Sequence, residues 1–167
     1  SACIRPYRRA TRAAPPLTGV QNLRVARYGF TPTQLSARAA YLLRGNDLGT
    51  MTSAAPKLYP HMWSWDAAFV TVGLAPLSVE RAVIEMDTLL SAQWHNGMIP
   101  HIVFANGRDG YFPGPARWEC ARLAECAPDF PDTSGITQPP VHAIAVQRIL
   151  DHSRRHGRTT RAVANEF

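Results

Sequence analysis

Residues 67–74 constrain the fold most, because they are apolar on nearly every side of a helix. A helix of this kind is buried in a globular protein, so it requires other helices around it. The apolar run continues to Leu77, but Thr71 and Pro76 interrupt it, and it is far shorter than the ~20 residues of a membrane helix. The sequence therefore predicts an all-α domain around this helix and no membrane partner.

Helix start and stop signals mark the neighbouring elements. Thr31 followed by Pro32 is typical of a helix N-terminus, and the helical pattern continues to Gly45. Ser64 is the predicted cap of the buried helix, and Ser78 is the predicted cap of a one-sided amphipathic helix that runs to about residue 94. These signals place at least three helices in the first half of the chain.

The second half alternates long loops with further helices. Residues 98–104 have extended character, and glycines and prolines predict a long loop over residues 107–115. We expect a weaker helix over residues 116–126, a clear helix over 141–156 and another from Thr159. Roughly five helices are thus joined by long loops, which in a compact domain are usually functional.

The net charge of +6 comes from one end of the chain. Residues 1–28 contain six arginines and no acidic residue, whereas residues 29–167 contain as many basic as acidic residues. We interpret residues 1–28 as a disordered Arg-rich leader outside the fold. A balanced body predicts no nucleic-acid partner, although a polyanion-binding or targeting role of the leader stays open.

Metal and cofactor motifs are absent from the sequence. Cys3, Cys120 and Cys126 form no CxxC pair, and His152 and His156 lack the glutamate of a HExxH motif. No GxSxG, P-loop or dinucleotide motif is present. We predict no metal and no cofactor, and cytoplasm is the default location because no hydrophobic signal segment opens the sequence.

The loops carry an unusual mixture of aromatic and polar residues. The aromatic ones are Tyr59, Trp63, Trp65, Trp94, Tyr111, Phe112 and Trp118, and the polar ones are Asp66, Gln93, His95, His101 and Gln138. Sugars require such a mixture, because their C–H faces pack on flat rings and their hydroxyls bond to carboxylates and amides. The sequence therefore predicts a polyol pocket between the helices.

Asp66 has two interpretations. As an acidic residue in the first turn of a helix it complements the helix dipole without any other role. Flanked by tryptophans and followed by an apolar helix, it is also expected to be half-buried, and buried charges are retained when they are paired or used. Both interpretations remain open from the residues alone.

Four segments together resemble one enzyme family. They are residues 59–69 (YPHMWSWDAAF), 93–104 (QWHNGMIPHIVF), 111–115 (YFPGP) and 133–140 (TSGITQPP). In order and spacing they are similar to the bacterial glucosylglycerate and mannosylglycerate hydrolases. The resemblance implies an inverting glycosidase, and residues 29–167 would form the N-terminal portion of an (α/α)6 toroid of twelve helices.

The resemblance also implies roles for individual residues. Trp63, Trp65 and Asp66 would line the subsite of the departing hexose. Tyr59 and Gln138 would lie in loops that close over the substrate, and Tyr111 and Gln138 would face the glycerate end. The implied partner is a small hexosyl-glycerate.

In the family that the chain resembles, the general acid and the general base lie beyond the position at which this sequence ends. Inversion requires both groups, so we expect the chain alone to be inactive as a glycosidase. A non-catalytic carbohydrate-binding helical module and a decayed gene product remain alternatives. We also expect that the apolar helix lacks partners and that the chain is prone to aggregate.

Overall fold

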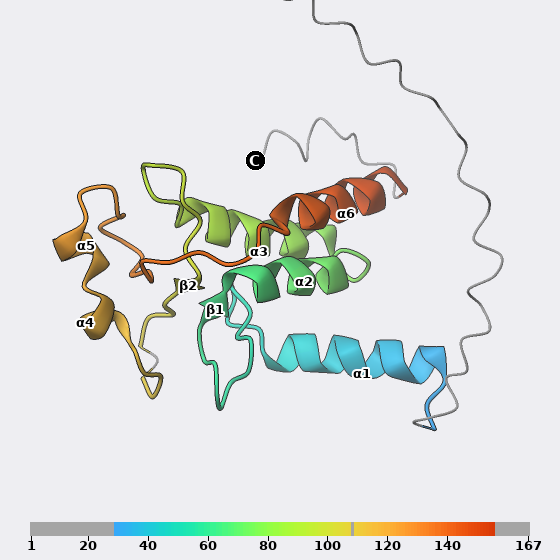
Figure 1. Ribbon diagram of the computed structural model, residues 1–167. Helices are drawn as coiled ribbons and strands as arrows, with labels where there is room; N and C mark the ends of the chain where they lie inside the picture. Colours follow the sequence, from blue (N-terminus) through green and yellow to red (C-terminus); the bar gives the residue numbers. More distant parts are fainter. Residues whose placement is uncertain (1–28, 108, 156–167) are drawn as a thin grey trace, which may run out of the picture.

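The computed structural model describes residues 29–107 and 109–155 of the protein (Figure 1). In chain order its elements are α1 (Pro32–Gly45), β1 (Met62–Trp63), α2 (Ser64–Leu74), α3 (Val79–Ser91), β2 (Ile102–Val103), α4 (Pro115–Trp118), α5 (Cys120–Leu123) and α6 (His142–Arg155). The predicted all-α class is confirmed. Three features that the sequence predicts lie outside the described residues. They are the leader over residues 1–28, His156, and the helix that begins at Thr159.

Helix α2 lies at the centre of the helical part. It contacts α1, α3 and α6, and Figure 1 shows it between α1 on one side and α6 on the other. Its side toward α3 and α6 is buried, including Ala67, Ala68 and Leu74. Phe69, which lies beside α6, is nevertheless 60% exposed, so the helix is surrounded less completely than its sequence predicts.

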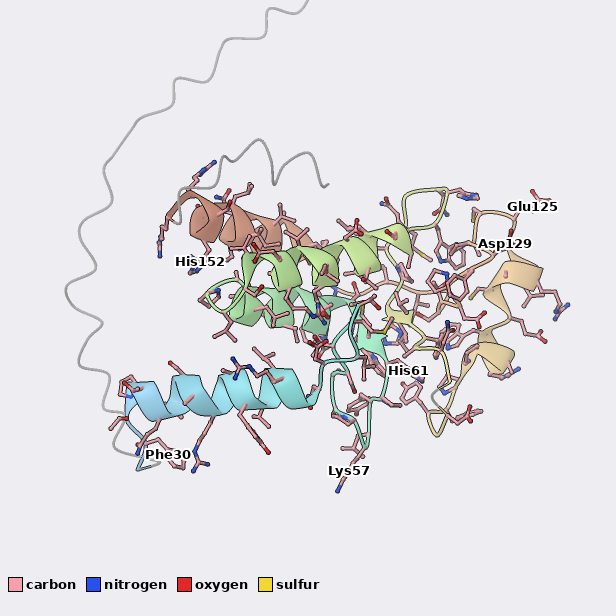
Figure 2. All side chains as sticks on the ribbon, turned by 180° about the vertical axis from the view of Figure 1, so that it is seen from behind. Phe30, Lys57, His61, Glu125, Asp129 and His152 are labelled. Carbon is pink, nitrogen blue, oxygen red and sulfur yellow. The ribbon has the colours of Figure 1, made fainter. Side chains whose placement is uncertain are left out.

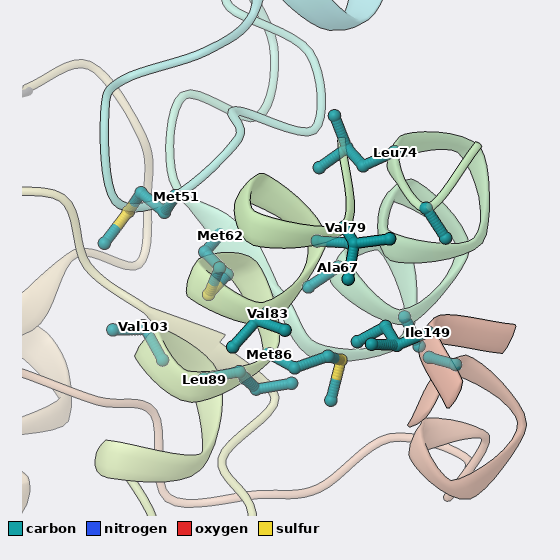
Figure 3. Close-up of a cluster of buried hydrophobic side chains, with 14 of the residues drawn as sticks. Met51, Met62, Ala67, Leu74, Val79, Val83, Met86, Leu89, Val103 and Ile149 are labelled. Carbon is teal, nitrogen blue, oxygen red and sulfur yellow. The ribbon is translucent and has the colours of Figure 1, made fainter. Parts of the chain in front are cut away.

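The main hydrophobic core fills the space between α2, α3 and α6 (Figure 3). Met62, Met86 and Leu89 are fully buried there, and Ile149 joins them from α6. Burying apolar side chains of this size stabilises the fold by about 1.5–3 kcal/mol each relative to leaving them exposed. The core thus fixes α2, and with it the residues at the start of α2.

The predicted cap of α3 is confirmed, and the predicted cap of α2 is wrong. The Ser78 hydroxyl accepts a hydrogen bond from the Arg81 N–H at 3.2 Å, as an N-cap should. Ser64, in contrast, is the first residue of α2 and makes no cap. Its hydroxyl lies 2.8 Å from Nε2 of His142 instead, and both residues are buried.

Helix α1 has the expected ends but no buried residue. Thr31 and Gln34 form a reciprocal capping box, in which each side chain accepts a hydrogen bond from the backbone N–H of the other residue. The helix approaches α2 where Gly73 faces Leu43, and a Cβ on Gly73 would lie only 3.2 Å from the Leu43 side chain. Glycine at this position permits the close approach.

The weaker helix expected over residues 116–126 is broken into two short ones. Glu119 lies between α4 and α5 and has φ of 47°, which is in the left-handed region that ends a helix. The extended segment expected over residues 98–104 contains β2, which pairs antiparallel with β1 through Met62↔Val103 and Trp63↔Ile102. This small sheet joins two of the aromatic loops.

A buried carboxylate anchors the loop between α1 and β1. Glu85 of α3 is fully buried and accepts hydrogen bonds from the Thr52 N–H at 3.1 Å and the Thr52 hydroxyl at 2.8 Å. Arg81 lies 2.9 Å from Glu85 and 2.9 Å from Asp47. Burial raises the pKa of Glu85, and its bonds to Thr52 and the charge of Arg81 work in the opposite direction. The network holds the loop that carries Tyr59.

None of the helices in the described ranges is long and apolar enough to cross a membrane.

Candidate functional site

An aromatic cluster forms where three loops meet beside the small sheet. The Trp63 ring lies edge-on to Tyr111, with centroids 4.9 Å apart, and edge-on to Tyr59, with centroids 5.1 Å apart. Trp63 comes from β1, Tyr59 from the loop before it and Tyr111 from the loop before α4. The structure therefore brings together three of the six predicted site residues.

Three further rings complete this cluster. His61 packs against Phe104 with centroids 5.0 Å apart and against Tyr111 at 6.0 Å, and His101 lies edge-on to Trp63 at 6.2 Å. Figure 2 shows His61 among the side chains crowded near β1. His61 and Phe104 were not predicted as site residues from the sequence. Both lie within the four segments that resemble the hydrolase family, so position in a segment was the available signal.

Backbone pairing brings together the segments that carry Tyr59, Trp63, His101 and Phe104. The β1–β2 pairing places Trp63 opposite Ile102, and β2 in turn forms a bridge from Val103 to Thr133. The His101 N–H donates to the Ile136 carbonyl at 2.7 Å. Three of the four family-like segments are thus tied side by side through their backbones.

Asp66 lies half-buried in the first turn of α2. Desolvation by burial raises its pKa, and the nearby charge of His101 acts in the opposite direction. The pKa of His101 is lowered by burial, and Asp66 opposes that shift. The two groups therefore interact electrostatically at the edge of the aromatic cluster, and hydrogen bonds from the backbone of Asp66 and from Trp65 also oppose the rise in the pKa of Asp66.

Gln138 and Trp65 are joined to each other rather than to the cluster. The Trp65 N–H donates to Oε1 of Gln138 at 3.0 Å, so a side chain 73 positions away satisfies a free N–H at the start of α2. The Trp65 ring is 42% exposed and packs near Phe69, with centroids 6.3 Å apart. Both residues therefore lie at the border of the site, at the first turn of α2.

The other residues that the sequence marks in the loops differ in their surroundings. Trp94 is buried and donates from Nε1 to the Thr133 hydroxyl at 2.9 Å, which holds the loop after α5. Trp118 packs on the cluster of Trp63, Ile102 and Phe104, whereas Phe112 is 81% exposed. The Gln93 amide donates to the Gly97 carbonyl at 2.8 Å. Trp94 and Gln93 therefore stabilise loops through their side-chain hydrogen bonds.

A cleft of about 410 Å³ opens next to the aromatic cluster. It is lined by His61, Asp109, Gly110, Tyr111, Phe112, Gly114, Pro115, Ala116 and Arg117. Of the six predicted site residues, Tyr111 lines this cleft. A larger cavity of about 570 Å³ lies between α3 and the loops at residues 48–51, 103–106 and 130–131, and none of the six predicted residues lines it.

The described ranges, residues 29–107 and 109–155, contain no group of three or more His, Cys, Asp or Glu that could hold a metal ion. Cys120 and Cys126 are free thiols, and burial raises the pKa of Cys120. The described side chains of the site are aromatic rings, the imidazole of His101, the half-buried carboxylate of Asp66 and the amide of Gln138.

The chain is similar to several hydrolases of sugar glycerates. It is 82% identical over 138 residues to the glucosylglycerate hydrolase of Mycolicibacterium hassiacum, an alignment that covers 83% of this chain and 31% of that protein. It is 44% identical over 119 residues to the mannosylglycerate hydrolase of Rubrobacter radiotolerans, covering 70% of this chain and 26% of that protein. The chain thus spans about a third or less of the length of these relatives.

The fold matches the crystal structure of the GH63 mannosylglycerate hydrolase of Thermus thermophilus in complex with Tris. The TM-score is 0.66 at 37% identity, and the match covers 78% of this chain and 30% of that one. A second structure of that enzyme, with Tris and D-glycerate, matches with a TM-score of 0.59. Both matches agree with the predicted portion of a larger helical domain. The mannosylglycerate hydrolase MGH1-like glycoside hydrolase domain matches residues 59–165, and the chain belongs to this family.

Proposed function

We propose that these residues form the sugar-binding part of an enzyme that hydrolyses the O-glycosidic bond of a hexosyl-glycerate with inversion. The observation that carries the proposal is the meeting of Tyr59, Trp63 and Tyr111 from three segments, with the half-buried Asp66 at their edge. The names of the relatives, glucosylglycerate and mannosylglycerate hydrolases, support this substrate class.

In the proposed complex the rings receive the C–H face of the hexose. A flat ring offers apolar area without a competing hydrogen bond, and Tyr hydroxyls add a polar edge. Asp66 accepts a hydrogen bond from a sugar hydroxyl, which is stronger for an ionised acceptor than for a neutral one. Trp65 and Gln138, next to Asp66 at the start of α2, complete the six proposed binding residues.

We propose that the general acid and the general base are supplied by residues outside these 167. Inverting hydrolysis needs two carboxyl groups about 6.5–9.5 Å apart, with a water on one face of the sugar. The six proposed binding residues include one carboxylate, Asp66. The chain by itself is then a sugar binder without hydrolytic turnover. Residues 29–167 are proposed as part of one (α/α)6 domain, and the cytoplasmic location stays a prediction.

Calorimetric titration of the 167-residue chain with glucosylglycerate tests this function. We expect saturable heat and no released glucose, and Asp66→Asn is expected to weaken binding by about 10- to 100-fold because it removes a charged acceptor. Asp129→Asn is the matched control, since Asp129 is exposed in the loop after α5. Absence of heat for the folded wild type contradicts the proposal, and rapid glucose release contradicts the external acid and base.

A further inference from the structure

Tyr59 is positioned by the backbone of its own loop rather than by burial. The residue is 47% exposed, and its ring meets the aromatic cluster edge-on, with centroids 5.1 Å apart from Trp63. The Tyr59 carbonyl accepts hydrogen bonds from the Ala55 N–H at 3.0 Å and from the Ser53 hydroxyl at 3.2 Å. Ser53 is 1% exposed, so it is a fixed point inside the protein. Whatever holds Ser53 therefore also holds Tyr59.

Glu85 of α3 holds the residue next to Ser53. Its Oε1 accepts a hydrogen bond from the Thr52 N–H at 3.1 Å, and its Oε2 accepts one from the Thr52 hydroxyl at 2.8 Å. Nη2 of Arg81 lies 2.9 Å from the same Oε2 and donates to the Thr52 hydroxyl at 3.1 Å. Thr52 and Glu85 are both buried, so water cannot replace a bond that is lost between them. Loss of either bond would leave Thr52 and the loop after it less fixed.

The position of Glu85 excludes direct contact with a ligand. The residue is fully buried, so a sugar cannot reach its carboxylate. Burying a carboxylate costs free energy, and such groups are retained where they are paired or used. Both oxygens of Glu85 bond to Thr52, and the next residue, Ser53, bonds to Tyr59. A continuous path thus leads from α3 to a residue of the proposed sugar site.

We propose that Glu85 is a positioning residue for sugar binding, which holds the Tyr59 ring in place against the sugar. Its carboxylate fixes Thr52, and the hydroxyl of Ser53 passes this constraint to the backbone of Tyr59. The role rests on the proposed function, because Tyr59 is one of the six proposed binding residues. The affinity for the sugar then depends on hydrogen bonds that the ligand does not touch.

Substitutions at Thr52 test the anchor without removing the buried carboxylate. Thr52→Val keeps the shape and the backbone N–H but loses the hydroxyl, whereas Thr52→Ser keeps the hydroxyl. In calorimetric titration of the 167-residue chain with glucosylglycerate, Thr52→Val is expected to bind about 3- to 10-fold more weakly, and Thr52→Ser within about twofold of the wild type. Glu85→Gln is expected to weaken binding at least as much as Thr52→Val, because an amide nitrogen replaces one of the two acceptor oxygens.

Hydrogen exchange in the absence of ligand measures the loop itself. The N–H groups of Ser53 and Tyr59 donate to backbone carbonyls at 2.9 Å and 2.6 Å. Both are expected to exchange about tenfold faster in Thr52→Val than in the wild type, while the amides of α6 change less, because the loop opens locally. Ile149→Val is the matched control for stability. It removes one methylene from a fully buried side chain on α6, so it lowers the urea midpoint and leaves the sugar affinity unchanged.

The possible results distinguish this role from the proposed function. If Thr52→Val and Glu85→Gln bind the sugar as tightly as the wild type, Glu85 has no positioning role and the sugar site stands. Equal weakening in Ile149→Val also overturns the role, because it traces the effect to overall stability. A wild type that does not bind glucosylglycerate overturns the proposed function and this role together. Circular dichroism shows which variants fold, and if Glu85→Gln does not, the two Thr52 variants decide.

Discussion

Ser64 and His142 form a buried polar contact between α2 and α6, near the proposed site. Ser64 is fully buried and His142 is 8% exposed, and their side chains lie 2.8 Å apart. A serine and a histidine at this distance also occur in nucleophilic catalysis, but that chemistry requires a serine that substrate can reach. Because Ser64 is buried, we interpret the pair as a structural contact that holds α2 against α6.

The stability of the protein should depend on pH through His142. Burial lowers the pKa of His142, and its contact with Ser64 opposes this shift. The unfolded chain therefore takes up a proton as the pH falls below about 6.5, while the folded chain still resists protonation. We expect the free energy of unfolding to decrease as the pH falls from the ordinary histidine pKa to the lowered pKa of His142.

Urea unfolding between pH 7.5 and pH 5 measures this effect. His142→Gln should flatten the pH dependence, because the amide retains hydrogen bonding and does not titrate. Burial also lowers the pKa of His101, so part of the dependence remains in this variant. His95→Gln, at an exposed position, is the control. Equal pH slopes in the wild type and His142→Gln would show that His142 is not involved.

The residue types of the site could be predicted from the sequence, but the arrangement of their side chains in space could not. The resemblance marked Tyr59, Trp63 and Tyr111, and the structure brings their rings together. The ring of Trp65 instead points toward Phe69, and the Gln138 amide binds the Trp65 N–H. Both outcomes depend on long-range packing, which short sequence patterns do not encode.

At the scale of elements, helix ends were predictable where their signals are local. Thr31 and Ser78 each bond to an N–H three residues later, so the cap can be recognised within four residues of sequence. Ser64 has the same residue type, but its hydroxyl is taken by His142, 78 positions away. A competing tertiary partner is therefore the reason that the third cap was wrong.

Helix α1 is expected to open more easily than the other long helices. It buries no residue, whereas α2, α3 and α6 all contribute to the main core. Local opening is cheapest where few apolar contacts are lost. In hydrogen exchange, the amides of α1 should exchange through local opening with a lower free energy than those of α3. Equal protection of the two helices would contradict this expectation.

At the scale of the whole molecule, an apolar surface remains exposed along α2 and α6. Phe69 is 60% exposed and Ile144 is 59% exposed, and they border a shallow groove lined by Ala68, Val72 and Val141. Monomeric proteins rarely leave large contiguous apolar patches open to water. The exposed groove supports the expectation that the isolated chain associates with itself.

Sedimentation velocity over a tenfold range of concentration tests this expectation. The 167-residue chain should show concentration-dependent association, and the double variant Phe69→Ser with Ile144→Ser should reduce it. Leu123→Ser removes a single exposed leucine on α5 and is the control that leaves association unchanged. A wild type that sediments as one monomeric species at every concentration is the contrary result.

The hydrogen bond between Gln138 and the start of α2 has a consequence for molecular motion. The Oε1 atom of Gln138 already accepts a hydrogen bond from the backbone N–H of Trp65, and the oxygen and the NH2 group of the amide have further hydrogen-bonding capacity for a ligand. A ligand that binds this amide is therefore linked to the first turn of α2. Because such coupling is reciprocal, a ligand that orders Gln138 also stabilises that turn, and fraying of the turn weakens the hold on the ligand.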